Sequence, residues 1–85
     1  MTVSESMKTW KGASPRQVIN EYGYPTRELT SPEGNLVYEY RYQGVGSNQY
    51  GAWTDVCHRS FEFKDNAVIR WQWKGNACSV RPREY

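Results

Sequence analysis

Residues 56–74, VCHRSFEFKDNAVIRWQWK, constrain the fold of this chain more than any other stretch. Apolar and polar side chains alternate through residues 56–64 and again through residues 67–74, and a period of two is typical of half-buried strands. The Asp-Asn pair between them matches a two-residue turn that joins antiparallel strands. The stretch therefore predicts a β-hairpin, and counting outward from its turn pairs Phe61 with Arg70.

A third alternating segment, residues 36–43, is expected to extend this hairpin into an antiparallel sheet. A short strand over residues 26–29 and a turn over residues 30–35, which contains Pro and Gly, are expected before it. The side chains expected on the buried face of the sheet are mostly aromatic: Leu36, Tyr38, Tyr40, Phe61, Phe63, Ile69 and Trp71. The Gly-rich residues 44–55 are expected to form a loop.

A helix over about residues 15–22 is indicated by signals at both of its ends. Ser14 and Gln17 match a capping box, and proline at the first helical position lacks only an N–H that would have no partner there. Gly23 can take the left-handed conformation that ends a helix. One face of this helix carries the side chains expected to cover the sheet: Val18, Ile19 and Tyr22.

A shorter first helix, capped by Ser4 and ended by Gly12, is expected before it. Eighty-five residues correspond to one domain, 1–85, with a folded part expected over about residues 5–79 and a frayed tail after it. Two short N-terminal helices packed on a three- to four-stranded antiparallel β-meander define an α+β fold.

The chain has two cysteines, Cys57 and Cys78. An even count in a small, aromatic-rich domain is typical of oxidising compartments, where disulfides persist. We expect a bridge that closes a loop of about 20 residues and stabilises the fold by roughly 3 kcal/mol. Gly75 and Asn76 allow the bend that this bridge requires. Two reduced thiols in a cytosolic protein are the alternative.

The residues do not predict catalysis or metal binding. His58 is the only histidine, and its neighbour Cys57 would point to the opposite face of the strand. Two cysteines and one histidine are one ligand short of a closed zinc site. Residues 44–49 lack the third glycine of a dinucleotide-binding loop. We therefore predict no enzymatic activity and no cofactor.

Binding is the remaining class of function. Basic and aromatic residues interleave on the strands, as they do in sheets that stack RNA bases. The net charge of the chain is only +2, however, and this weak positive charge argues against binding to nucleic acid. Tyr50 and Trp53 belong to residue types enriched at protein-binding hot spots. These two rings either fold back over the core or contact a protein partner. A second candidate surface is the polar sheet face around Glu39, Arg41 and Arg70.

The order of these elements resembles the SmpA/OmlA-type small outer-membrane lipoproteins, a group that includes the accessory lipoprotein of the β-barrel assembly machinery. The resemblance spans about residues 8–78 and rests on KGASPRQVINEYGYP (11–25) and FEFKDNAVIRW (61–71). It implies two helices packed on a three-stranded antiparallel sheet, likened to one repeat of β-lactamase inhibitor protein. The cysteine that carries the lipid anchor in that family has no counterpart here.

The resemblance also implies a non-catalytic domain that supports an outer-membrane or secretion assembly through protein contacts. Its location would be periplasmic and outer-membrane associated, if a leader has been removed, and membrane attachment would need a lipid anchor that is not present in this chain. An inhibitor or immunity-type protein binder on the same fold is the alternative, and a basic-aromatic nucleic-acid-binding module is a further one.

Overall fold

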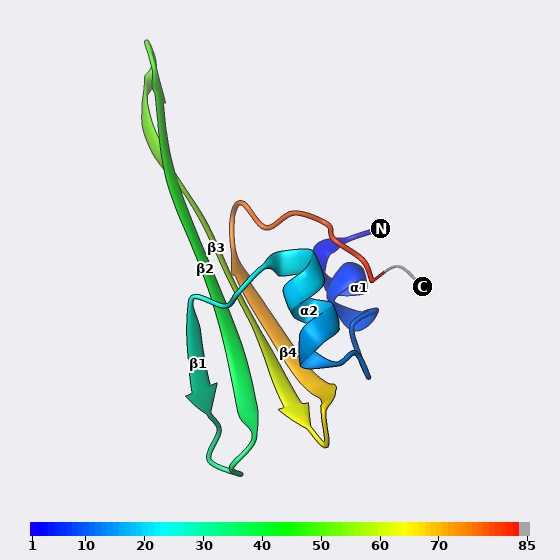
Figure 1. Ribbon diagram of the computed structural model, residues 1–85. Helices are drawn as coiled ribbons and strands as arrows, with labels where there is room; N and C mark the ends of the chain where they lie inside the picture. Colours follow the sequence, from blue (N-terminus) through cyan, green and yellow to red (C-terminus); the bar gives the residue numbers. More distant parts are fainter. Residues whose placement is uncertain (84–85) are drawn as a thin grey trace.

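The computed structural model describes residues 1–83, which form two helices and one four-stranded antiparallel sheet (Figure 1). The elements follow in the order α1 (Val3–Lys8), α2 (Pro15–Tyr22), β1 (Arg27–Thr30), β2 (Leu36–Asn48), β3 (Gly51–Lys64) and β4 (Ala67–Gly75). Neighbours in the chain are neighbours in the sheet, so the sheet is a meander. The α+β prediction is confirmed at this level. Neither described helix has the length and apolar character needed to cross a membrane.

Helix α2 begins and ends where the sequence predicts. Ser14 Oγ accepts a hydrogen bond from the Gln17 N–H at 3.2 Å, and Gln17 Oε1 accepts one from the Ser14 N–H at 2.9 Å. The two bonds satisfy N–H groups that a helix start otherwise leaves unpaired. Gly23 ends the helix with a φ of +81°. Helix α1 has the same type of cap, but Thr2 forms it and not Ser4, because the helix starts at Val3.

The β3–β4 hairpin has the predicted turn and a different register. Asp65 and Asn66 both have positive φ, 51° and 66°, as a type I′ turn requires. A bulge then shifts the pairing between Glu62 and Phe63. As a result, Phe61 lies opposite Trp71 and not opposite Arg70.

The side chain of β4 that enters the core beside the turn is Val68, because the turn pairs it with the inward-facing Phe63. Val68 is 1% exposed, whereas Ile69, which was expected on the buried face, is 38% exposed. The extra residue of a bulge is left without a partner across the strands, and Ile69 is the residue skipped between the pairs of Val68 and Arg70. Leu36, at the start of β2, is 36% exposed and also lies outside the core.

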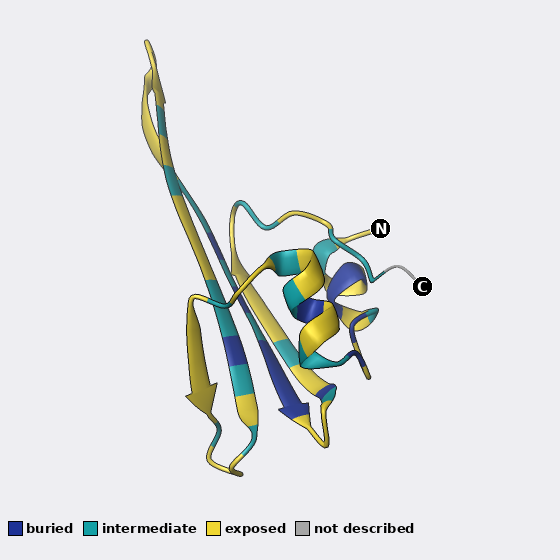
Figure 2. Ribbon diagram, viewed as in Figure 1, coloured by how far each residue is buried: buried dark blue, intermediate teal, exposed yellow. Residues whose placement is uncertain are grey.

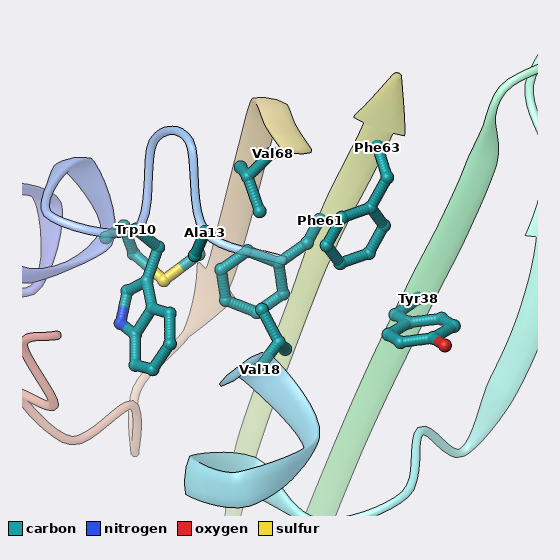
Figure 3. Close-up of a cluster of buried hydrophobic side chains, with 8 residues drawn as sticks. Trp10, Ala13, Val18, Tyr38, Phe61, Phe63 and Val68 are labelled. Atoms are coloured by element: carbon teal, nitrogen blue, oxygen red, sulfur yellow. The ribbon is translucent and has the colours of Figure 1, made fainter. Parts of the chain in front are cut away.

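One buried cluster joins the helical region to the sheet, with Phe61 near its centre (Figure 3). The ring of Phe61 is fully buried and lies 5.4 Å from the ring of Tyr22 and 6.2 Å from that of Trp10, centroid to centroid. The buried members are Met7, Trp10, Ala13, Val18, Tyr38, Phe61, Phe63 and Val68. Other predicted core residues are partly buried at its margin: Ile19, Tyr22, Tyr40 and Trp71.

Residues 44–55 are not a loop but the outer half of the β2–β3 hairpin. Pairing between these strands runs from Leu36–Phe63 to Asn48–Gly51 without a shift. Strand β1 reaches only the level of Glu39 and β4 only that of Cys57, so the hairpin continues as a two-stranded ribbon beyond the body (Figure 1). We call residues 43–56 the arm. Most of the arm is exposed (Figure 2), and the molecule measures 50 × 27 × 19 Å.

Residues 76–83, which follow β4, are not frayed, because they cross back over the helices; the last two residues of the predicted tail lie outside the described residues. The carbonyl of Arg81 accepts hydrogen bonds from Trp10 Nε1 at 2.9 Å and from Tyr22 Oη at 3.3 Å. The N–H of Arg83 donates to Thr9 Oγ1 at 2.7 Å. These contacts bring the two ends of the described chain together on the helical side of the molecule (Figure 1).

Replacing Phe61 by alanine should lower the free energy of unfolding by about 3–5 kcal/mol, because it removes the ring on which both helices and the sheet pack. Ile69→Ala, at the exposed bulge, should cost less than about 1 kcal/mol. Urea unfolding of the oxidised proteins, followed by far-UV circular dichroism, measures both values. Similar losses in the two variants would contradict this description of the core.

Candidate functional site

The glycines of the arm make room for aromatic rings. Gly46 lies opposite Trp53, and a Cβ at Gly46 would collide with the indole ring of Trp53. A Cβ at Gly44 would likewise meet the phenol ring of Tyr42. Glycine in a strand often marks such a close approach. Gly44 and Gly46, which make residues 44–55 resemble a loop in the sequence, therefore leave space for the rings of Tyr42 and Trp53 over β2.

The apolar side chains of the arm are exposed. Tyr50 is 88% exposed, Val45 82% and Trp53 46%. Tyr50 lies in the turn at the tip, where its N–H donates a hydrogen bond to Asn48 Oδ1 at 2.8 Å. Neither aromatic ring belongs to the core cluster, so the rings do not cover the core. Exposed apolar side chains that gather on one projection are typical of an interaction surface.

A groove of about 520 Å³ lies at the base of the arm, beside the C-terminal segment. It is lined by side chains from α2, the α2–β1 connection, β2, β3 and the C-terminal segment, chiefly Tyr22, Tyr24, Tyr40, Tyr42, Asp55, Arg59 and Arg81. Burial is the main cause that raises the pKa of Tyr22 and Tyr40 above the ordinary tyrosine value. Both hydroxyls are therefore neutral hydrogen-bonding groups at physiological pH.

Arg59 is a buried cation in the wall of this groove. It is 5% exposed, and within residues 1–83 no carboxylate forms an ion pair with it. Its guanidinium donates to Tyr22 Oη at 3.0 Å, to Ser79 Oγ at 3.2 Å and to the Ser79 carbonyl. Neutral acceptors thus satisfy Arg59 and leave its positive charge uncompensated, which is costly in a buried position. An arginine on the apolar face of the alternation, between Cys57 and Phe61, is the sequence signal for this residue.

Arg81 adds a second guanidinium to the groove. It lies 4.8 Å from the centroid of the Tyr22 ring, and Arg59 lies 5.1 Å from the same centroid. Arg81 also forms an ion pair with Glu21 at 3.1 Å. Asp55 is the acidic residue that lines the groove.

The predicted disulfide between Cys57 and Cys78 is present, with 4.9 Å between the two Cα atoms. Asn76 makes the bend that leads to it. Its side-chain oxygen accepts from the Val56 N–H at 2.8 Å, and its side-chain nitrogen donates to the Thr54 carbonyl at 3.1 Å. The side chain of Asn76 therefore makes the hydrogen bonds to β3 that the backbone of β4 would make if that strand continued.

The polar sheet face carries the three remaining candidate residues in two separate ion-pair groups. Glu39 Oε1 lies 2.9 Å from Arg27 Nη2 and 3.8 Å from Arg41 Nε. Arg70 pairs with Glu62 at 3.4 Å and with Glu33 at 3.8 Å. The structure thus brings Glu39 and Arg41 together and places Arg70 in the other group.

Glu62 is a largely buried carboxylate on β3. Its side chain is only 11% exposed and accepts a hydrogen bond from Asn35 Nδ2 at 2.9 Å. This hydrogen bond is the main cause that lowers the pKa of Glu62, and Arg70 contributes to the same shift. The carboxylate connects the β1–β2 turn to β3.

His58 lies on the polar sheet face, in a second groove with Ser60 and Lys74. Among the described residues, no three His, Cys, Asp or Glu side chains form a group that could hold a metal ion. Comparison with family models, curated proteins and solved structures finds no match to this chain. Membership of the SmpA/OmlA-type family therefore stays a prediction.

Removing the disulfide with the double change Cys57→Ser and Cys78→Ser should lower the free energy of unfolding by about 3 kcal/mol, since a loop of this length is then open in the unfolded state. Denaturant midpoints of the variant and of the oxidised parent measure the effect. The double change Thr54→Ser and Ser79→Thr, which retains the disulfide, controls for substitution as such. A midpoint equal to that of the parent would show that the bridge does not stabilise the fold.

Glu62→Gln should reduce the acid sensitivity of the protein. Because the pKa of Glu62 is lower in the folded state, its contribution to stability is complete well above its unfolded pKa of about 4.3. The contribution is lost as the pH falls through the lower folded-state value. The loss of stability between about pH 5 and pH 3 should be shallower in this variant than in the parent or in Glu33→Gln. Thermal melts across this range test the prediction, which parallel pH profiles would contradict.

Proposed function

We propose that this chain is a non-catalytic domain that binds a partner protein through the arm. The observation that carries the proposal is the projection of exposed Tyr50, Val45 and Trp53 beyond the body on one continuous hairpin. Recognition residues usually lie on segments positioned by a rigid scaffold. Here the pairing of β2 with β3 continues from the packed core directly into the arm.

The contact chemistry of the arm is apolar and aromatic. Its one carboxylate is Asp55, at the groove, and residues 43–54 contain no charged side chain. Tyrosine and tryptophan supply large contact areas with few rotatable bonds, which is why they are frequent at hot spots. The arm therefore suits insertion into a partner more than electrostatic attachment to a charged surface.

We further propose that the domain works in an oxidising compartment, as part of an outer-membrane or secretion assembly in the periplasm. The disulfide between Cys57 and Cys78 supports an oxidising compartment. The resemblance of residues 11–25 and 61–71 to the SmpA/OmlA-type lipoproteins supports the envelope. An inhibitor-type binder is the second candidate, and the narrow tip around Tyr50 favours it, since a two-stranded hairpin can enter the cleft of an enzyme.

The test compares Tyr50→Ala and Trp53→Ala with the parent protein. The parent captures its partner from an envelope extract, and the purified partner is then titrated with each variant by calorimetry. A hot-spot ring contributes about 2 kcal/mol, so at least one variant should bind about 30-fold more weakly. Trp73→Ala, a tryptophan 38% exposed on β4 and away from the arm, is the matched control.

All variants must first show the far-UV spectrum and disulfide of the parent. If Tyr50→Ala and Trp53→Ala both bind the partner as tightly as the parent does, the arm is not the recognition surface. Inhibition of an enzyme by the parent, lost in the same variants, would favour the inhibitor-type function over an assembly role.

A further inference from the structure

The edge of β2 in the arm has unpaired backbone groups. The N–H of Arg41 points away from β3 and donates to Thr26 Oγ1 at 3.0 Å, just before β1 begins. Backbone groups alternate sides along an antiparallel strand, so those of Gln43, Val45 and Ser47 point to the same side as Arg41. No other strand or side chain among residues 1–83 pairs with β2 at these three positions.

The opposite edge of the arm is occupied near its base. The side chain of Asn76 bonds the Val56 N–H and the Thr54 carbonyl, and the Ala77 N–H donates to the Val56 carbonyl at 3.0 Å. The outward groups of β3 are thus paired at Val56 and at the Thr54 carbonyl, and within residues 1–83 this pairing does not continue to Ala52. The two edges of one ribbon therefore differ, and that of β2 offers the longer run of free groups.

The β2 edge also lacks the features that usually protect an edge strand. Natural sheets discourage pairing at an edge with charged side chains, proline or bulges. Residues 43–48, QGVGSN, contain no proline and no charge, and the β2–β3 register has no shift along them. Gly44 and Gly46 add no side-chain bulk beside Val45. The edge is therefore a regular template for one more strand.

The groove of about 520 Å³, which we call the tyrosine groove because Tyr22, Tyr24, Tyr40 and Tyr42 line it, lies at the base of the same edge. Thr26, directly before β1, and Arg41 on β2 line the groove together with Tyr42. A strand added along residues 43–47 would reach the groove as it passes Tyr42. The groove is lined there by Arg59, whose charge has no carboxylate partner within residues 1–83, and by Arg81, which pairs with Glu21. Three arginines, Arg41, Arg59 and Arg81, line the groove against the one carboxylate of Asp55, so its net positive charge favours an acidic side chain.

We propose that the β2 edge of the arm accepts an extended, acidic segment of a partner protein as a fifth strand, with one carboxylate of that segment in the tyrosine groove. The proposal rests on the protein-binding function and specifies the partner chemistry. Main-chain hydrogen bonds from residues 43, 45 and 47 provide affinity, and the groove provides the preference for Asp or Glu. Aromatic side chains of the arm contact the rest of the partner.

A second copy of this chain is a poorer occupant of the edge. Pairing of two β2 edges would place residues 43–48 of one arm on those of another, and this segment has no carboxylate to offer the groove. Arg59 would then keep its charge without a counter-ion. Charge complementarity thus favours a foreign acidic segment over self-association.

The probe is a phage library of random twelve-residue peptides, panned on the oxidised parent and on Val45→Pro. Proline removes the outward N–H of Val45 and leaves the β2–β3 pairing intact, since that N–H does not face β3. Val45→Thr, which keeps the N–H and the β-branched shape, is the matched control. The most enriched peptide is synthesised and titrated against the parent, both Val45 variants and Arg81→Gln.

We expect enriched peptides to be acidic and free of proline. Val45→Pro should weaken binding at least tenfold, Val45→Thr less than threefold, and Arg81→Gln severalfold at low salt. Hydrogen exchange of the peptide-bound parent should slow at the amides of Gln43, Val45 and Ser47. Failure to enrich any peptide, enrichment of neutral or basic peptides, or equal binding to Val45→Pro would overturn the proposal.

Two results separate this proposal from the broader protein-binding function. If the native partner loses affinity for Trp53→Ala but binds Val45→Pro as tightly as the parent, the arm is a binding surface and strand addition is wrong. If sedimentation shows a dimer of the parent that Val45→Pro dissociates, the occupant of the edge is a second copy, and the acidic segment is wrong.

Discussion

The unbroken pairing of β2 with β3 is the interaction on which the rest of this structure depends. Its lower half carries Tyr38 and Phe61 into the core, and its upper half forms the arm. Because one register runs through both halves, the orientation of Trp53 at the arm is determined by the packing of Phe61 in the body. A shift of one residue would exchange the two faces of both strands. The core therefore also positions the arm.

Arg59 shows how this small domain connects its layers with polar contacts as well as apolar ones. The side chain occupies a core position on β3 and reaches the hydroxyl of Tyr22 on α2 and the carbonyl of Ser79 in the C-terminal segment. An apolar residue of similar size would pack there without the cost of burying a charge. The arginine leaves a positive wall beside the groove, which connects its placement to recognition rather than to stability alone.

Local signals in the sequence predict much of this fold. The cap at Ser14, the turn at 65–66 and the pairing of Cys57 with Cys78 are all present, because each depends on residues close in sequence or on a simple constraint. The bulge at Ile69 depends on packing across strands and has no local signature. The strand conformation of Gly44 and Gly46 depends on the rings of Tyr42 and Trp53, which a single-strand pattern does not show. For the candidate site, Tyr50 and Trp53 stand out in the sequence, but their exposure depends on the pairing of β2 with β3, so the sequence leaves it open. The groove was not predictable, because five separate segments build it.

The contacts of the C-terminal segment have a consequence for the order of folding. Each strand pairs with the next one in the chain, so the sheet can form through short loops that close at little entropic cost. The bond from Trp10 to the Arg81 carbonyl joins residues 71 positions apart. Closing so long a loop is favourable only once the sheet and α1 have brought the two ends near each other. Docking of this segment is therefore a late step of assembly. The bridge between Cys57 and Cys78 spans only 21 positions, so the β3–β4 hairpin brings the two cysteines together without that docking, and oxidation does not have to wait for it.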